Sequence, residues 1–186
     1  MTDDRTLTPQ AIEVAASPDL VLAQHLLDTL RSAMRRQRSL CERALAQLQP
    51  ADWHVRLDVE SNSVAIIVRH LAGNLRSRWT DFLTTDGDKP ERDRVGEFAI
   101  TETTAEQLMA EWDEAWEIAS ATLEALVPSD LDRTVTIRGV PHSVAQAIVR
   151  NLEHTGQHVG QIVFLAKHLR GDAWQALSIP TPRREA

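Results

Sequence analysis

The sequence predicts an all-α protein, a four-helix bundle with a small β-hairpin before the last helix. Four long stretches repeat apolar residues at the three- and four-residue spacings of an α-helix. The one alternating stretch is short, with Val135 and Ile137 set against Thr134 and Thr136. Four amphipathic helices bury their apolar faces economically by packing together. With 186 residues, we expect one domain, residues 1–186, with its own core.

The first helix is expected from Ser17 to about Gln49. Ser17 is a good N-cap and Pro18 suits the first helical position. Pro50 ends the helix. Residues 1–17 are expected to form an N-terminal lead-in, either a loose segment or a short helix.

The second helix is expected to begin at Ser61–Ser63 and to reach about Leu83. Its first turns, residues 64–68, are apolar all round, which indicates burial on more than one side. His70 follows directly and lies off the centre of the main apolar stripe. Residues 84–100 then form a long charged connection, and such segments are usually crossovers, lids or binding loops.

The third and fourth helices each follow a capping-box pattern. Thr103 with Glu106 opens a helix that runs to about Val127, and Ser143 with Gln146 opens one that ends at Gly171. Before the fourth helix, the chain is expected to form a hairpin that turns at Arg138 and Gly139. Residues 171–186 form a C-terminal tail, expected to strap over another element through Trp174 and Ile179.

Composition excludes several classes of function. The formal charge of −7 argues against nucleic-acid binding and against an anionic lipid surface. Cys41 is the only cysteine, so an internal disulfide cannot form, and its apolar neighbours predict a buried thiol. We find neither a signal-peptide pattern nor an apolar run long enough to span a membrane. We therefore expect a soluble, cytoplasmic protein.

A pair of histidines lies within the fourth predicted helix. His154 and His158 are four residues apart, so they project from one face only about 40° apart. Neutral imidazole suits zinc, nickel, copper or iron. Two ligands do not complete a site, and the strongest candidate for a third is His70. Either a parallel or an antiparallel pair of helices could bring the three rings level.

Two segments resemble the DinB/YfiT-like superfamily of metalloenzymes, in a bacterial subgroup with no assigned function. They are HLAGNLRSRWTDFLTTDGDKP and EHTGQHVGQIVFLAKHLRGDAWQALSIP. The resemblance implies a four-helix bundle with a crossover, usually a homodimer. It also implies a divalent ion, zinc or nickel, held by His70, His154 and His158. The family often has HRGQ after its last ligand, and this chain has HVGQ, with Val159 in place of arginine.

The resemblance leaves two functions open. The first is a metal-dependent transferase or hydrolase, with a low-molecular-weight thiol or water in the fourth coordination position. The second is a non-catalytic dimeric bundle with a structural or vestigial ion. No general acid or base is evident from the sequence.

Several polar residues are expected to serve structure rather than function. Asn74, Asp81, Gln157 and Gln161 could line a pocket, although solvated helix faces explain them more simply. Arg76 and Arg78 are expected at the surface rather than as a substrate clamp. The remaining histidines, His25, His54, His142 and His168, are expected to be structural.

Overall fold

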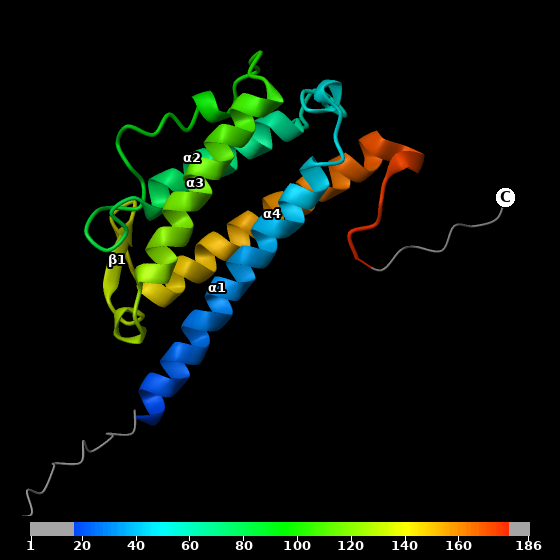
Figure 1. The fold of residues 1–186 in the computed structure, drawn as a ribbon. Helices are drawn as coiled ribbons and strands as arrows, with labels where there is room; N and C mark the ends of the chain where they lie inside the picture. The colour runs from blue at the N-terminus through cyan, green and yellow to red at the C-terminus, as the bar shows by residue number, and fades with distance from the viewer. Residues whose placement is uncertain (1–16, 179–186) are drawn as a thin grey trace, which may run out of the picture.

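The computed structural model describes residues 17–178, in which four long helices lie side by side (Figure 1). A two-stranded antiparallel hairpin immediately precedes the last helix, so the prediction of a helical protein with a hairpin at this place is confirmed. The expected lead-in before residue 17 and the predicted contact of Ile179 lie outside the described residues. The elements are α1 (Pro18–Leu45), α2 (Val64–Trp79), α3 (Ala105–Ala125), β1 (Thr134–Ile137), β2 (Val140–Ser143) and α4 (Val144–Arg170).

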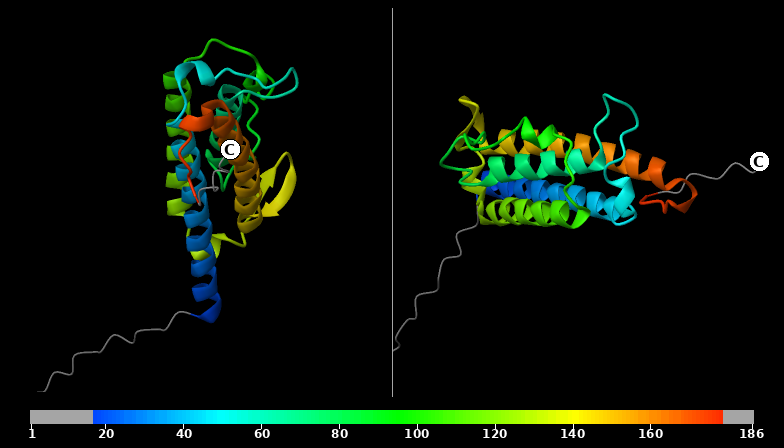
Figure 2. Two further views of the ribbon diagram at one scale, coloured as in Figure 1. Left: turned by 90° about the vertical axis from the view of Figure 1, so that its right-hand side faces the viewer. Right: turned by 90° about the horizontal axis from the view of Figure 1, so that it is seen from above.

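Side-chain contacts between helices show how α2, α3 and α4 run relative to one another. Side-chain contacts join His70 to His154 and Asn74 to Asn151, so α2 and α4 are antiparallel. By contrast, α2 and α3 are parallel, since contacts join Arg69 to the start of α3 and Trp79 to its later part at Thr122. The connection after α2 must therefore return along the whole helix before α3 begins (Figure 2). This connection is a crossover, one of the roles expected for it.

Side-chain caps start all four helices. Ser17, Ser63, Thr104 and Ser143 each accept a hydrogen bond from a backbone N–H in the first turn. The predicted capping box of α3 was one residue early: Thr104 pairs with Gln107. The Thr103 hydroxyl instead accepts from the Arg69 guanidinium.

Two helices end about four residues earlier than predicted. α1 ends at Leu45 and α2 at Trp79. After α2, Thr80 is extended and Asp81 has a positive φ of 48°, a backbone conformation that cannot continue a helix. The apolar residues beyond these ends still pack inward, which explains why the periodic pattern overran the helices.

The core is built on apolar side chains from all four helices, with tryptophan prominent. Trp79, Trp112 and Trp116 are fully buried, and Cys41 is buried as predicted. Burial raises the pKa of the Cys41 thiol far above its usual range. Within residues 17–178, no helix combines the length and apolar character needed to cross a membrane.

The tail beyond α4 folds back onto the end of α1. Trp174 packs against the core, and the Gln47 side-chain amide exchanges two hydrogen bonds with the backbone of Gln175. The predicted strap is confirmed for this part of the tail.

Asp86 fastens the crossover to the tip of the hairpin. The hairpin turns through Arg138 and Gly139, both with positive φ, the pattern of a type I′ turn. The backbone N–H groups of these two residues each donate to the Asp86 carboxylate at 2.8 Å. Burial raises the pKa of Asp86, but the backbone donors outweigh it and lower the pKa to about 2.

We predict that Asp86→Ala lowers the free energy of unfolding by about 1–3 kcal/mol, because charge-assisted hydrogen bonds are lost. Since the folded pKa lies below the unfolded value of 3.8, the wild-type contribution is present above about pH 4. It disappears as the pH falls towards 2. Urea unfolding at pH 7 and pH 3 measures both effects. The control is Asp132→Ala, which removes an exposed carboxylate that takes no part in this contact. Equal stability of the two variants would refute the role of Asp86.

Candidate metal centre

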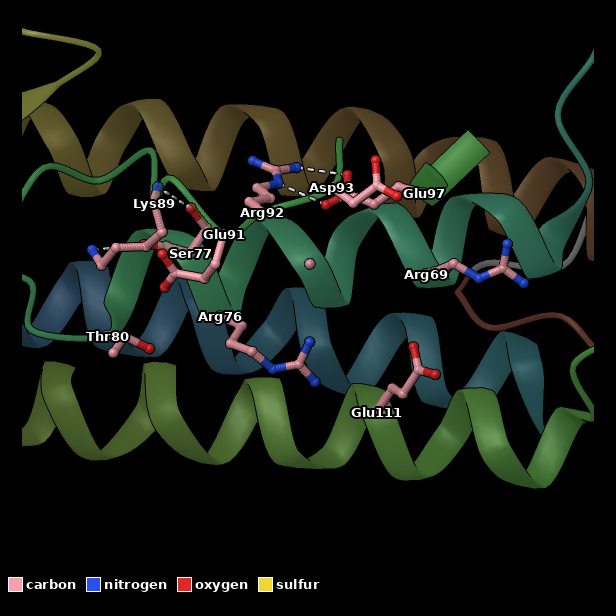
Figure 3. A pocket seen from close by; sticks show the side chains of 11 residues that line it. Arg69, Arg76, Ser77, Thr80, Lys89, Glu91, Arg92, Asp93, Glu97 and Glu111 are labelled. Atoms are coloured by element: carbon pink, nitrogen blue, oxygen red, sulfur yellow. Dashed lines mark hydrogen bonds and ion pairs between the residues drawn. The ribbon is translucent and has the colours of Figure 1, made fainter. Parts of the chain in front are cut away.

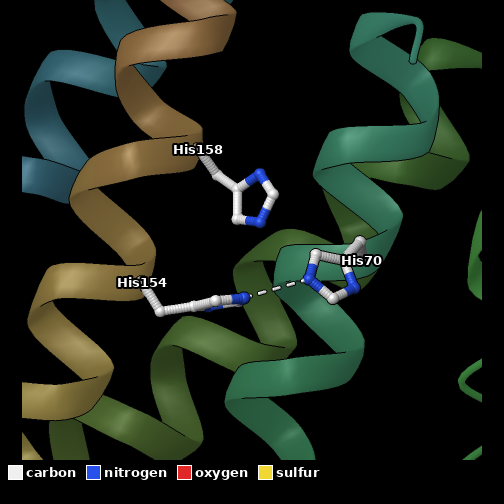
Figure 4. A group of neighbouring side chains, drawn as sticks. All are labelled: His70, His154 and His158. Atoms are coloured by element: carbon white, nitrogen blue, oxygen red, sulfur yellow. Dashed lines mark hydrogen bonds between the residues drawn. The ribbon is translucent and has the colours of Figure 1, made fainter. Parts of the chain in front are cut away.

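Three histidine side chains from two helices point toward one another (Figure 4). His70 comes from α2, and His154 and His158 come from successive turns of α4. One ligand atom from each residue can be chosen so that all three lie within 4.8 Å of one another. His70 Nε2 and His154 Nε2 are 3.1 Å apart. The antiparallel packing of α2 and α4 therefore brings together the three residues expected from the sequence.

The spacing of these atoms is close to that of a metal site. Since no pair is more than 4.8 Å apart, one point lies within about 3 Å of all three atoms, against about 2 Å for a zinc–nitrogen bond. To bind zinc, the rings would have to move inward by about 1 Å. Within residues 17–178, the group has no fourth histidine, cysteine, aspartate or glutamate. The three histidines are close enough to bind a metal ion while leaving coordination positions open.

The environment keeps the imidazoles on α4 neutral. Burial, reinforced by the neighbouring His158 and His70, lowers the pKa of His154 to about 4. Burial also lowers the pKa of His158. His154 Nδ1 is buried without a hydrogen-bond partner among the described residues. Neutral imidazoles have a free lone pair, which is the form that binds a metal.

Glu97 orients His70 from the opposite side. The Glu97 carboxylate accepts a hydrogen bond from His70 Nδ1 at 2.8 Å, so His70 Nε2 keeps its lone pair for the centre. Arg92 donates to both carboxylate oxygens, at 2.6 and 2.7 Å. Although burial raises the pKa of Glu97, Arg92 and His70 lower it overall. A histidine held by a carboxylate in this way is typical of metal ligands.

His158 also has a partner that fixes its ring. Its Nδ1 donates to Gln161 Oε1 at 2.8 Å, which leaves Nε2 free. Asn74 is buried, so it does not belong to a solvated helix face, whereas Gln161 is exposed. The prediction of a solvated helix face was therefore wrong for Asn74, while Gln161 lies at the surface and also holds the His158 ring.

A cavity of about 330 Å³ opens beside His70 and His154. We call it the histidine cavity. Arg78 contributes to its wall and is only 6% exposed, so the expectation of a surface position for this residue was wrong. Asp81 takes no part in the lining. The lining residues are His70, Asn74, Arg78, Arg94, Arg138, Arg150, Asn151, Glu153, His154 and Gln157.

A second cavity, of about 360 Å³, lies along another face of α2 (Figure 3). Glu97 and Arg92 contribute to its wall, so this ion pair separates the second cavity from His70. Its cations are paired: Arg76 contacts Glu114, and Lys89 donates to the backbone oxygens of Ser77 and Asp86. The histidines do not line this cavity.

Comparison with known families gives one match. A family described as "Protein of unknown function (DUF1572)" matches residues 21–183. The chain belongs to this family. No curated protein matches it. The DUF1572 match covers α1 apart from its first three residues, the other three long helices, the hairpin and each of the three histidines.

The other histidines of this DUF1572 chain stand apart from the group. His54 Nε2 contacts the backbone oxygen of Thr103, and His142 Nδ1 contacts that of Val140. His25 and His168 are exposed on the surface. Each of the four therefore has the structural or surface position expected from the sequence.

Gly73 makes room for Glu97. A Cβ atom at this position would lie 2.8 Å from the Glu97 carboxyl carbon, closer than real side chains approach. Gly160 on α4 has open space at the same point. Sequence reasoning missed Glu97, and the glycine three residues after His70 is the local signal that something packs closely there.

We predict that Gly73→Ala weakens zinc binding at least about tenfold, the usual effect of disturbing a residue that orients a ligand. Isothermal titration calorimetry with zinc measures the affinity, and thermal melts verify that the variant is folded. Gly160→Ala is the matched control and should bind zinc as the wild type does. Glu97→Gln, which preserves the shape of the side chain, should repeat the loss, and unchanged affinity in both variants would rule out the role of Glu97.

Proposed function

We propose that this protein is a DinB-like metal-dependent enzyme in which His70, His154 and His158 hold one divalent ion, zinc or nickel. The reaction is a transfer of a low-molecular-weight thiol or a hydrolysis. One observation supports the proposal above the others: three imidazoles converge beside a cavity, and no fourth protein ligand joins them within the described residues. An open coordination position next to a cavity is typical of catalytic rather than structural metal sites.

We further propose that the whole chain is one DinB-like four-helix bundle domain. The order of helix directions supports this reading, since the parallel pair α2 and α3 requires the crossover that the resemblance implies. The family match spans residues 21–183, from the first turn of α1 to beyond the end of α4.

The chain's own residues supply orientation and a proton acceptor. A bound zinc ion would lower the pKa of water or of a thiol in the open position to near neutrality. Glu97 holds the proton on His70 Nδ1, and Gln161 does the same for His158. Glu153 is the one carboxylate among the described residues lining the histidine cavity. We propose it as the group that accepts a proton from the thiol or water.

The second candidate function is a non-catalytic homodimer with a structural or vestigial ion. Exposed apolar side chains on the first turns of α1 support the homodimer: Leu20, Leu22 and Leu26 are 47%, 69% and 43% exposed. A sealed metal site would favour this candidate, whereas the cavity beside His154 favours the enzyme. A homodimer is compatible with both functions.

We predict about one divalent ion per chain in protein purified without added metal. His154→Ala should lose the ion, because two remaining ligands bind weakly. His168→Ala removes an exposed histidine from the same helix and should retain the ion. Elemental analysis by mass spectrometry measures all three proteins. Equal metal content in wild type and His154→Ala would remove the proposed site.

We predict that the zinc-loaded protein transfers a thiol to an electrophile. With glutathione and an aryl chloride as probes, the sulfur displaces chloride to form a thioether, and the thiol proton is released. The rate should fall to background after chelation and return when zinc is added. Thiol consumption measured by absorbance reports the reaction. A rate indifferent to the chelator would leave the non-catalytic homodimer as the better account.

A further inference from the structure

The histidine cavity is strongly cationic in a chain whose overall charge is −7. Four of its lining residues are arginines and one is a glutamate. Because acidic residues outnumber basic ones by 27 to 20 in the whole chain, this concentration of arginine is not a consequence of composition. The charge lies beside the proposed metal centre.

Arg78 is the most unusual of the four. It is only 6% exposed, and its Nη1 is buried without a hydrogen-bond partner among the described residues. Gly87 leaves space for it, since a Cβ there would lie 2.5 Å from Arg78 Nη1 and 3.1 Å from Arg78 Cδ. A buried charge without a partner opposes folding by several kcal/mol. Because Arg78 also lines the histidine cavity, an anion in that cavity would offset part of this cost.

The three other arginines of the histidine cavity also have few carboxylate partners. The Arg150 side chain forms no hydrogen bond or ion pair with any residue of the described range 17–178. Arg94 and Arg138 share a single carboxylate, Asp88, at 3.7 and 3.2 Å. Asp88 also faces Arg92 at 3.8 Å. One carboxylate thus serves three guanidinium groups, two of which, Arg94 and Arg138, line the histidine cavity.

The second cavity shows that this imbalance is specific. It has basic residues too, but Arg76, Lys89 and Arg92 all have partners there. Unpaired positive charge is concentrated where the histidines are. Burial and the nearby Arg150 lower the pKa of Arg78 to about 10, although the Asp88 carboxylate raises it. The guanidinium therefore remains charged at neutral pH.

We propose that the histidine cavity binds the oxyanion group of a small substrate, a carboxylate or a phosphate, on Arg78 and Arg150. The guanidinium fork matches either group through paired N–H donors. The reacting end of the substrate then lies at His70 and His154, and this second half of the inference rests on the proposed function. A volume of about 330 Å³ is at the small end for ligand sites, so the substrate is a small anionic molecule.

Anion binding is tested with inorganic phosphate and acetate as separate probes, by isothermal titration calorimetry at low ionic strength. Metal is first removed with a chelator, so binding to an ion cannot contribute. We expect saturable binding of at least one probe to the wild type. Arg78→Gln should weaken it at least tenfold and Arg150→Gln at least threefold. The probe that binds more tightly identifies the substrate group as phosphate or carboxylate.

Arg36→Gln is the matched control, because it removes one exposed arginine from α1 and changes the net charge equally. It should bind both probes as the wild type does. Arg150 is exposed, so Arg150→Gln keeps the test decisive if Arg78→Gln fails to fold. Absence of saturable binding, or equal affinity in the wild type and Arg150→Gln, would overturn the proposal.

The same titration on His154→Ala separates the two proposals. Anion binding that persists there, together with loss of metal, supports both. Anion binding by a wild type that contains no metal would support the anion site and remove the metal site. A wild type that contains metal but does not bind either probe would support the metal site and remove the anion site.

Discussion

The register of α2 against α4 is the constraint on which the site depends. A buried chain of hydrogen bonds sets it: Trp79 Nε1 donates to Asn151 Oδ1, and Asn151 Nδ2 donates to Asn74 Oδ1, each at 2.9 Å. Asn74 lies one turn from His70, and Asn151 lies one turn from His154. Sliding one helix by a turn, about 5.4 Å, would leave these buried groups unpaired, at about 1–3 kcal/mol each. The hydrogen bonds that fix the register of α2 against α4 therefore also fix the relative positions of the three histidines.

The histidines could be predicted because helix periodicity carries the information. The spacing of His154 and His158 alone places them on one face of a helix. The third member of the group, His70, could be chosen because it lies at a suitable height along the second helix. A further signal went unused: His70, Asn74 and Arg78 are spaced by four residues, a polar stripe along α2. All three are buried or line the histidine cavity. Helix α2 thus has two buried faces, one apolar and one polar, as its apolar first turns already indicated.

Glu97 and the burial of Arg78 could not be predicted in the same way. Glu97 reaches His70 from 27 residues away, out of a connection that has no repeating pattern. Its position depends on how the crossover returns along α2, which no local spacing encodes. Arg78 is buried because the crossover covers it at Gly87. The crossover therefore decides the polar environment of the site, while the helices decide the positions of its ligands.

The two proposed ligands should favour each other's binding. The histidine cavity already concentrates guanidinium groups beside the three imidazoles, so a divalent cation alone would add charge of the same sign. An oxyanion on Arg78 neutralises part of that charge and strengthens metal binding. By thermodynamic reciprocity, the metal strengthens anion binding by the same factor. Because each ligand binds the folded state, each also offsets the free energy that unpaired charge and crowded rings take from the fold. Arrangements that oppose folding in the free protein are thus the ones that an ion and a small anion, bound together, would satisfy.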